Sequence, residues 1–92
     1  MKEAYERMYK IYYDVATQYT EDDLTVRIKR INRFRDGLCG MVELLESVKE
    51  FSSEEAEKER ERIINTFSSI KMLNAYMNDG EVYVFAEHYR NS

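Results

Sequence analysis

The sequence predicts an all-α fold: a three-helix domain built around one long antiparallel helical hairpin. Apolar residues recur at steps of three and four over long stretches, which keeps them on one side of a helix. None of the 92 residues is proline, which would cost ~3 kcal/mol inside a helix. A chain of this length buries only roughly 60–65% of its unfolded surface, so we expect one domain over residues 1–92 that self-associates.

The central element is a helix predicted over residues 21–51. Thr20 and Asp23 have the spacing of an N-terminal cap. Gly37 and Gly40 each cost roughly 1 kcal/mol inside a helix. The apolar stripe continues in phase across them, which favours an unbroken helix. Its members are Leu24, Ile28, Ile31, Phe34, Leu38, Met41, Leu45 and Val48.

The first helix is predicted over residues 2–19 and carries five of the eight tyrosines. A tyrosine ring packs while its hydroxyl seeks a partner or water. The tyrosines therefore either pack against the bundle or a second subunit, or leave rings open to stack on a planar ligand. Two adjacent rows are expected on this helix: Met8, Ile11, Tyr12, Val15 and Tyr19, and beside them Tyr5, Tyr9, Tyr13 and Ala16.

The third helix is predicted over residues 53–78. Ser52 and Glu55 have the spacing of a capping box, and Glu54 with Lys58 is a favourable pair one turn apart. The first half, residues 54–62, is almost wholly charged and predicts a solvated arm or an assembly face. A short connection makes this helix antiparallel to the previous one. Its apolar positions are Ala56, Ile63, Phe67, Ile70, Leu73 or Asn74, and Met77.

Gly80 is expected to end the third helix and to begin a tail over residues 80–92. Residues 81–87 are rich in β-forming side chains. A strand there would need a partner strand from another chain, because backbone groups must be paired. The alternative is an irregular or helical tail whose apolar residues close over the bundle.

The net charge of −4 argues against general binding to long nucleic acids or membranes. A basic run is the local exception, and it either pairs with acids on another helix or binds phosphate. Arg30 and Arg33 share a face with Gly37 and Gly40. The run consists of Arg27, Lys29, Arg30, Arg33 and Arg35.

The sequence contains no pattern typical of an enzyme, a cofactor site or a metal site. Cys39 and His88 are its only cysteine and histidine, too few for metal spacing or a nucleophile–base pair. A single cysteine forms no internal disulfide, and the N-terminus has no apolar signal core. We expect a soluble cytoplasmic protein, in the host cytoplasm if it is viral.

The hairpin resembles the small phage proteins that sequester cyclic-nucleotide alarm signals, the anti-CBASS and anti-Thoeris sponges. Residues 20–24 are similar to the acidic opening of that family's hairpin, and residues 32–35 to its Asn-Arg run. Met41, Leu44 and Leu45 match the following stripe, and Thr66 with residues 72–74 resembles the last helix. The arginine run here is denser, the glycines are shifted, and the tail has no counterpart.

This resemblance implies a homo-oligomer that binds cyclic oligonucleotides between subunits without cleaving them. The base-stacking tyrosine falls on Tyr12, or else on Tyr9 or Tyr13, the phosphate contact on Arg27 or Lys29, and the late threonine on Thr66. The alternative function is a small helical module or inhibitor that docks on a larger protein. The candidate ligand-binding residues are Tyr12, Tyr9, Tyr13, Arg27, Lys29, Arg30, Arg33 and Thr66.

Overall fold

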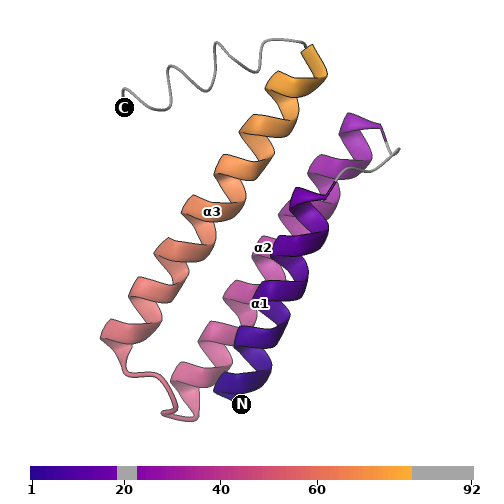
Figure 1. Ribbon diagram of the computed structural model, residues 1–92. Helices are drawn as coiled ribbons and strands as arrows, with labels where there is room; N and C mark the ends of the chain where they lie inside the picture. The colour runs from indigo at the N-terminus through magenta and orange to yellow at the C-terminus, as the bar shows by residue number, and fades with distance from the viewer. Residues whose placement is uncertain (19–22, 80–92) are drawn as a thin grey trace.

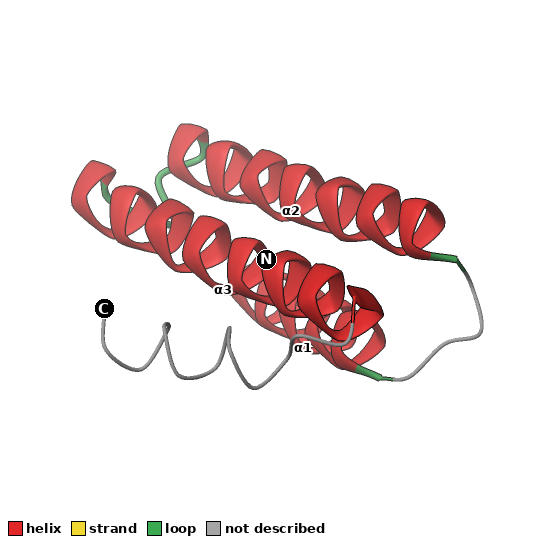
Figure 2. Ribbon diagram, turned by 90° about the horizontal axis from the view of Figure 1, so that it is seen from above, coloured by secondary structure: helices red, strands yellow, loops and turns green. Residues whose placement is uncertain are grey.

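The computed structural model describes residues 1–18 and 23–79, with side chains as far as residue 74. Three helices make up this part of the chain, and it contains no strand (Figures 1 and 2). They are α1 (Lys2–Thr17), α2 (Leu24–Ser47) and α3 (Ser53–Asp79). The all-α, three-helix prediction is therefore confirmed. The predicted tail over residues 80–92, the Gly80 cap, Tyr19 and Thr20 lie outside the described residues.

α2 and α3 form the antiparallel hairpin, and α1 packs on α2 and on the first half of α3 (Figure 1). The start of α1 lies beside the connection between α2 and α3. Lys2 marks this junction, because its ammonium lies 5.1 Å from the centre of the Phe51 ring and 3.7 Å from a Glu55 carboxylate oxygen. The chain therefore returns on itself twice. No helix in the described ranges is both long enough and apolar enough to cross a membrane.

The core is one buried apolar cluster to which all three helices contribute. Ile31, Leu38 and Leu45 are buried as predicted. Val42, absent from the predicted stripe, has no exposed surface, because it follows Leu38 by one turn on the same side of the helix. Val48 was predicted to be in the stripe but is 50% exposed, since α2 has already ended at Ser47.

Both ends of α2 differ from the predicted range of 21–51. Asp23 is the N-cap, and its carboxylate accepts a 2.9 Å hydrogen bond from the backbone N–H of Val26. At the other end, Lys49 has a positive φ of 65°. The N–H groups of Glu50 and Phe51 both donate to the Leu45 carbonyl, at 2.9 and 3.1 Å. This turn redirects the chain and buries Phe51 in the core.

The predicted capping box at the start of α3 is confirmed. The Ser52 N–H donates to Glu55 Oε1 at 3.0 Å, and the Glu55 N–H donates to Ser52 Oγ at 3.1 Å. These bonds, led by the one from the Ser52 backbone, lower the pKa of the Glu55 carboxyl. The carboxylate therefore contributes stability above its ordinary pKa, and this contribution is lost as the pH falls through the lowered pKa.

The prediction that residues 54–62 form a solvated arm is wrong. Ala56 has no exposed surface, and Arg60 forms a 3.1 Å ion pair with Glu46 of α2. The charged side chains lie on the flanks of α3 while alanine supplies the contact with the core, so charge density along the sequence hid a buried face. The predicted Glu54–Lys58 pair does form, at 4.0 Å between two exposed side chains.

We expect Ser52→Ala to lower the free energy of unfolding by about 1 kcal/mol, the usual cost of losing an N-cap. The change removes the acceptor for the Glu55 N–H. Urea denaturation measures the loss. Ser53→Ala is the matched control, because Ser53 is exposed at the neighbouring position and its side chain forms no hydrogen bond. Equal losses in the two variants would contradict the capping role.

Candidate functional site

The tyrosines of α1 form a seam against α3, beginning at Tyr5. This ring has no exposed surface, and its hydroxyl donates a 2.8 Å hydrogen bond to Glu59 Oε1. Arg62 lies 2.9 Å from the same carboxylate oxygen. Burial, followed by the hydrogen bond to Glu59, raises the pKa of the Tyr5 phenol well above its ordinary value. Tyr5 is therefore a buried, neutral hydrogen-bond donor.

Tyr9 continues the seam one turn later. Its hydroxyl donates to Thr66 Oγ1 at 3.0 Å, so the structure joins two of the predicted ligand-binding residues. One side of the ring meets the edge of Phe67 at 5.8 Å, and the Arg62 guanidinium lies 4.0 Å from the ring centre. Tyr9 and Thr66 therefore satisfy each other within the fold.

Tyr12 packs against α2 instead. Its ring stacks on Phe34, with centroids 4.4 Å apart and planes 8° from parallel. Its edge also lies over Gly37, 3.8 Å from where a β-carbon would stand. One face of Tyr12 is thus occupied by a protein ring. A nucleotide base stacking on that face would have to displace Phe34.

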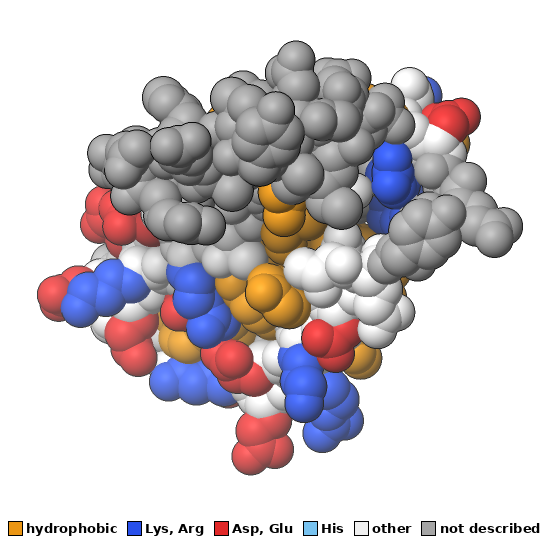
Figure 3. All heavy atoms as spheres, turned by 45° about the horizontal axis from the view of Figure 1, so that its top comes forward, with side chains coloured by type: hydrophobic (Ala, Val, Ile, Leu, Met, Phe, Trp, Pro, Cys, Tyr) orange, Lys and Arg blue, Asp and Glu red, His pale blue; other side chains and the backbone are white. Residues whose placement is uncertain are grey.

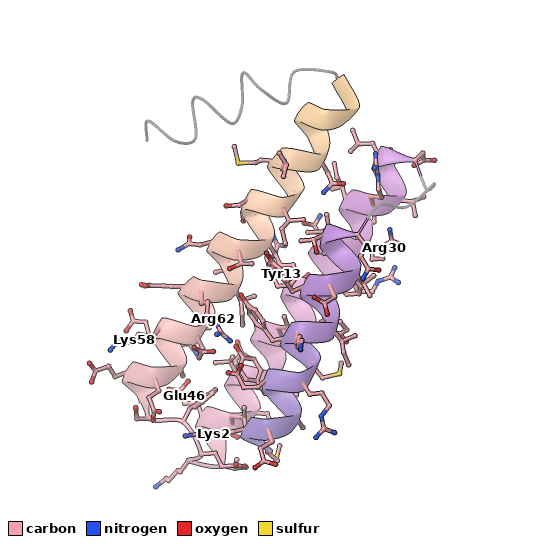
Figure 4. All side chains as sticks on the ribbon, in the orientation of Figure 1. Lys2, Tyr13, Arg30, Glu46, Lys58 and Arg62 are labelled. Carbon is pink, nitrogen blue, oxygen red and sulfur yellow. The ribbon has the colours of Figure 1, made fainter. Side chains whose placement is uncertain are left out.

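Tyr13 is the most exposed of the three predicted stacking tyrosines, at 42%. It lies on the side of α1 that faces α3, whereas Arg30 lies on the opposite side of the α1–α2 pair (Figure 4). The structure therefore does not bring Tyr13 together with the predicted basic residues.

The basic half of α2 presents cations in different directions. Lys29 and Arg33 are exposed, and among the described residues neither forms an ion pair. Arg27 is half-buried, four residues before the core residue Ile31 on the same face of the helix, and its buried Nε has no hydrogen-bond partner. Arg35 pairs with its neighbour Asp36 at 3.2 Å. Partner acids from another helix thus leave Arg27, Lys29 and Arg33 unpaired.

Both glycines lie in an unbroken α2, as predicted. A β-carbon at Gly37 would make ordinary contact with Tyr12, and one at Gly40 would meet nothing within 4 Å. Neither position requires glycine for packing within the chain. The helical cost of the two glycines therefore has no return inside one protomer.

The polar centre of the seam, Glu59 and Arg62, is absent from the predicted site. Both lie in the charged half of α3 and bond to α1. Their sequence signal was their three-residue spacing, which places two opposite charges on one face beside the apolar positions Ala56 and Ile63. The prediction of an arm concealed it.

The surface seen in Figure 3 mixes basic and acidic side chains around a small apolar area, without a broad region of one sign. Within the described ranges, no three side chains gather in a way that could hold a metal ion. Burial raises the pKa of the Cys39 thiol, which makes it a weaker nucleophile at neutral pH. No chemistry on a substrate can be assigned to these groups.

Comparisons with protein families, curated proteins and solved structures gave no match to this chain. The resemblance to the phage sponges therefore stays a prediction, and function has to be argued from the geometry.

We expect Tyr5→Phe to lower the free energy of unfolding by roughly 1–2 kcal/mol, because it removes a hydrogen bond to a charged group. Tyr13→Phe is the matched control, since the Tyr13 hydroxyl forms no hydrogen bond to the described residues. Urea denaturation compares the two. Equal stability of the variants would contradict the role of the seam.

The raised pKa of Tyr5 also predicts a pH dependence. The stability it contributes is complete below the ordinary phenol pKa and is lost as the pH rises towards the raised value. In an ultraviolet titration of tyrosinate, one phenol should resist ionisation until the protein unfolds. Tyr5→Phe should abolish this late step, and its persistence in that variant would assign it to another tyrosine.

Proposed function

We propose that this chain is a non-catalytic interaction protein that binds another protein through a face formed by α1 and α2. The observation that supports it is a set of aliphatic side chains left about half exposed in a domain whose other large side chains are mostly packed. They are Ile11 at 47%, Val26 at 46%, Leu44 at 49% and Val48 at 50%.

Three of these residues belong to one stripe along α2. Successive members are three or four residues apart, which places them on a common face turned away from the core. We call this set the outer stripe: Val26, Arg30, Arg33, Gly37, Gly40, Leu44 and Val48.

Ile11 extends the outer stripe onto α1. It lies two residues beyond Tyr9, nearly half a turn around the helix from the side that contacts α3. It also precedes Tyr12, which contacts Gly37, so it stands level with the glycines. Fully burying one such side chain contributes about 1.5–3 kcal/mol, so covering half-exposed ones favours a partner.

Sequestration of a small cyclic oligonucleotide, as in an anti-defence sponge, is the second candidate. It is favoured by Arg27, Lys29 and Arg33, which lack ion-pair partners among the described residues. A compact anion would pair with these cations, whereas the acidic whole disfavours long nucleic acids. Packing of Tyr9 and Tyr12 within the fold leaves this candidate without open stacking rings, so we rank it second.

A photo-crosslinking amino acid tests the interaction face. Placed at position 44 and expressed in the native host, it should form a discrete protein adduct, while the same group at position 65 on the exposed outer side of α3 should form none. Adducts of equal yield at both positions, or none at either, would refute the proposal.

Thermal unfolding with a panel of cyclic di- and trinucleotides tests the second candidate. A ligand at a hundred times its Kd adds about 2.7 kcal/mol of stability, a shift of many degrees in so small a domain. Arg33→Gln should abolish the shift, and Lys58→Gln, which neutralises an exposed cation on α3, should preserve it. An unchanged melting temperature across the panel would eliminate nucleotide binding.

A further inference from the structure

We propose that the outer stripe of α2 binds the outer stripe of a second copy of this chain, antiparallel, with a twofold axis between residues 38 and 39. This inference rests on the proposed function, since it names the occupant of the same face. It is carried by the charges, the glycines and the exposed aliphatic residues, which all obey that one axis.

The charges decide between antiparallel and parallel pairing. Arg33 and Glu43 are exposed, and neither forms an ion pair among the described residues. They are ten residues apart, about 15 Å along the helix, too far to pair within one chain. The proposed axis puts Arg33 of one copy level with Glu43 and Leu44 of the other. A parallel arrangement would align like charges instead.

The glycines obey the same axis. Residues 37 and 40 are equidistant from its centre, so Gly37 of each copy faces Gly40 of the other. A β-carbon on Gly40 would meet nothing within its own protomer, so the open space there is available to a second helix. Two facing glycines allow the backbones to approach closely, which gives the cost of each glycine a return in the assembly.

The aliphatic residues complete the contact. Ile11 projects level with Gly37, where the side chain of each copy can fill the space left by the glycines of the other. Leu44 meets the aliphatic stem of Arg33 across the axis, while the guanidinium reaches Glu43. The α1–α2 pairs of two copies then form a four-helix layer whose two halves use the same patch, as a twofold interface requires.

The mass in solution, measured against concentration, tests the dimer. We expect the wild-type chain to dimerise, and Gly40→Arg to raise the dimer Kd by at least about thirtyfold, the effect of losing one hot-spot contact. Gly40→Arg should not destabilise the monomer, because the position is open and arginine favours helix. Asn65→Arg adds the same charge to the outer side of α3 and should leave the Kd unchanged.

A charge exchange tests the antiparallel arrangement itself. Arg33→Glu and Glu43→Arg should each weaken the dimer, because each places like charges opposite one another. The double variant should restore dimerisation to near the wild-type Kd. A double variant as weak as the single variants would overturn the proposed axis, and circular dichroism verifies that all three remain helical.

The photo-crosslinking experiment separates the two proposals. A monomeric wild-type chain that crosslinks from position 44 to a different protein would overturn the dimer and leave the proposed function standing. A crosslink from position 44 to the chain itself, with a dimeric mass, would support both. A monomer with no adduct would refute both.

Discussion

The packing of α2 on α3 is the contact on which the rest of the molecule depends. Leu38, Val42 and Leu45 on one helix, with Ala56 and Ile63 on the other, are almost without exposed surface. The turn that follows α2 adds Phe51 to the same cluster. α1 makes far less contact with α3 than α2 does, so it is the hairpin that offers α1 a surface on which to fold.

α1 is attached to that surface by side chains that are apolar on the ring and polar at the tip. Burying a tyrosine is favourable only if its hydroxyl finds a partner, because an unpaired polar group is costly inside a protein. Glu59 and Thr66 provide those partners from α3. The charged half of α3 thereby gains a structural role, and the tyrosines are no longer open for stacking on a ligand.

What remains for binding is the surface that the core and the seam do not use. The outer stripe combines exposed aliphatic residues, two glycines and an unpaired arginine in a helix whose opposite side is fully packed. A second copy satisfies the charges and the glycines together, whereas a small anion satisfies only the charges. This difference is why a protein–protein function ranks above nucleotide sequestration.

The sequence by itself determined the helices and their beginnings. Periodic apolar residues, the Ser52–Glu55 box and the in-phase glycines are local signals, and the α2–α3 hairpin follows from them with a short connection. The range of α2 was less accurate, because Asp23 caps it and the turn at Lys49 ends it.

Only the tertiary structure decided what the side chains of the candidate site do. Two rows of tyrosines were readable on α1, but periodicity could not state how far the helix is rotated against its neighbours. That rotation pairs Tyr9 with Thr66, stacks Tyr12 on Phe34 and turns Ile11 outward. The physical reason is that a helical repeat defines a face, while the partner of that face is chosen by packing among all three helices.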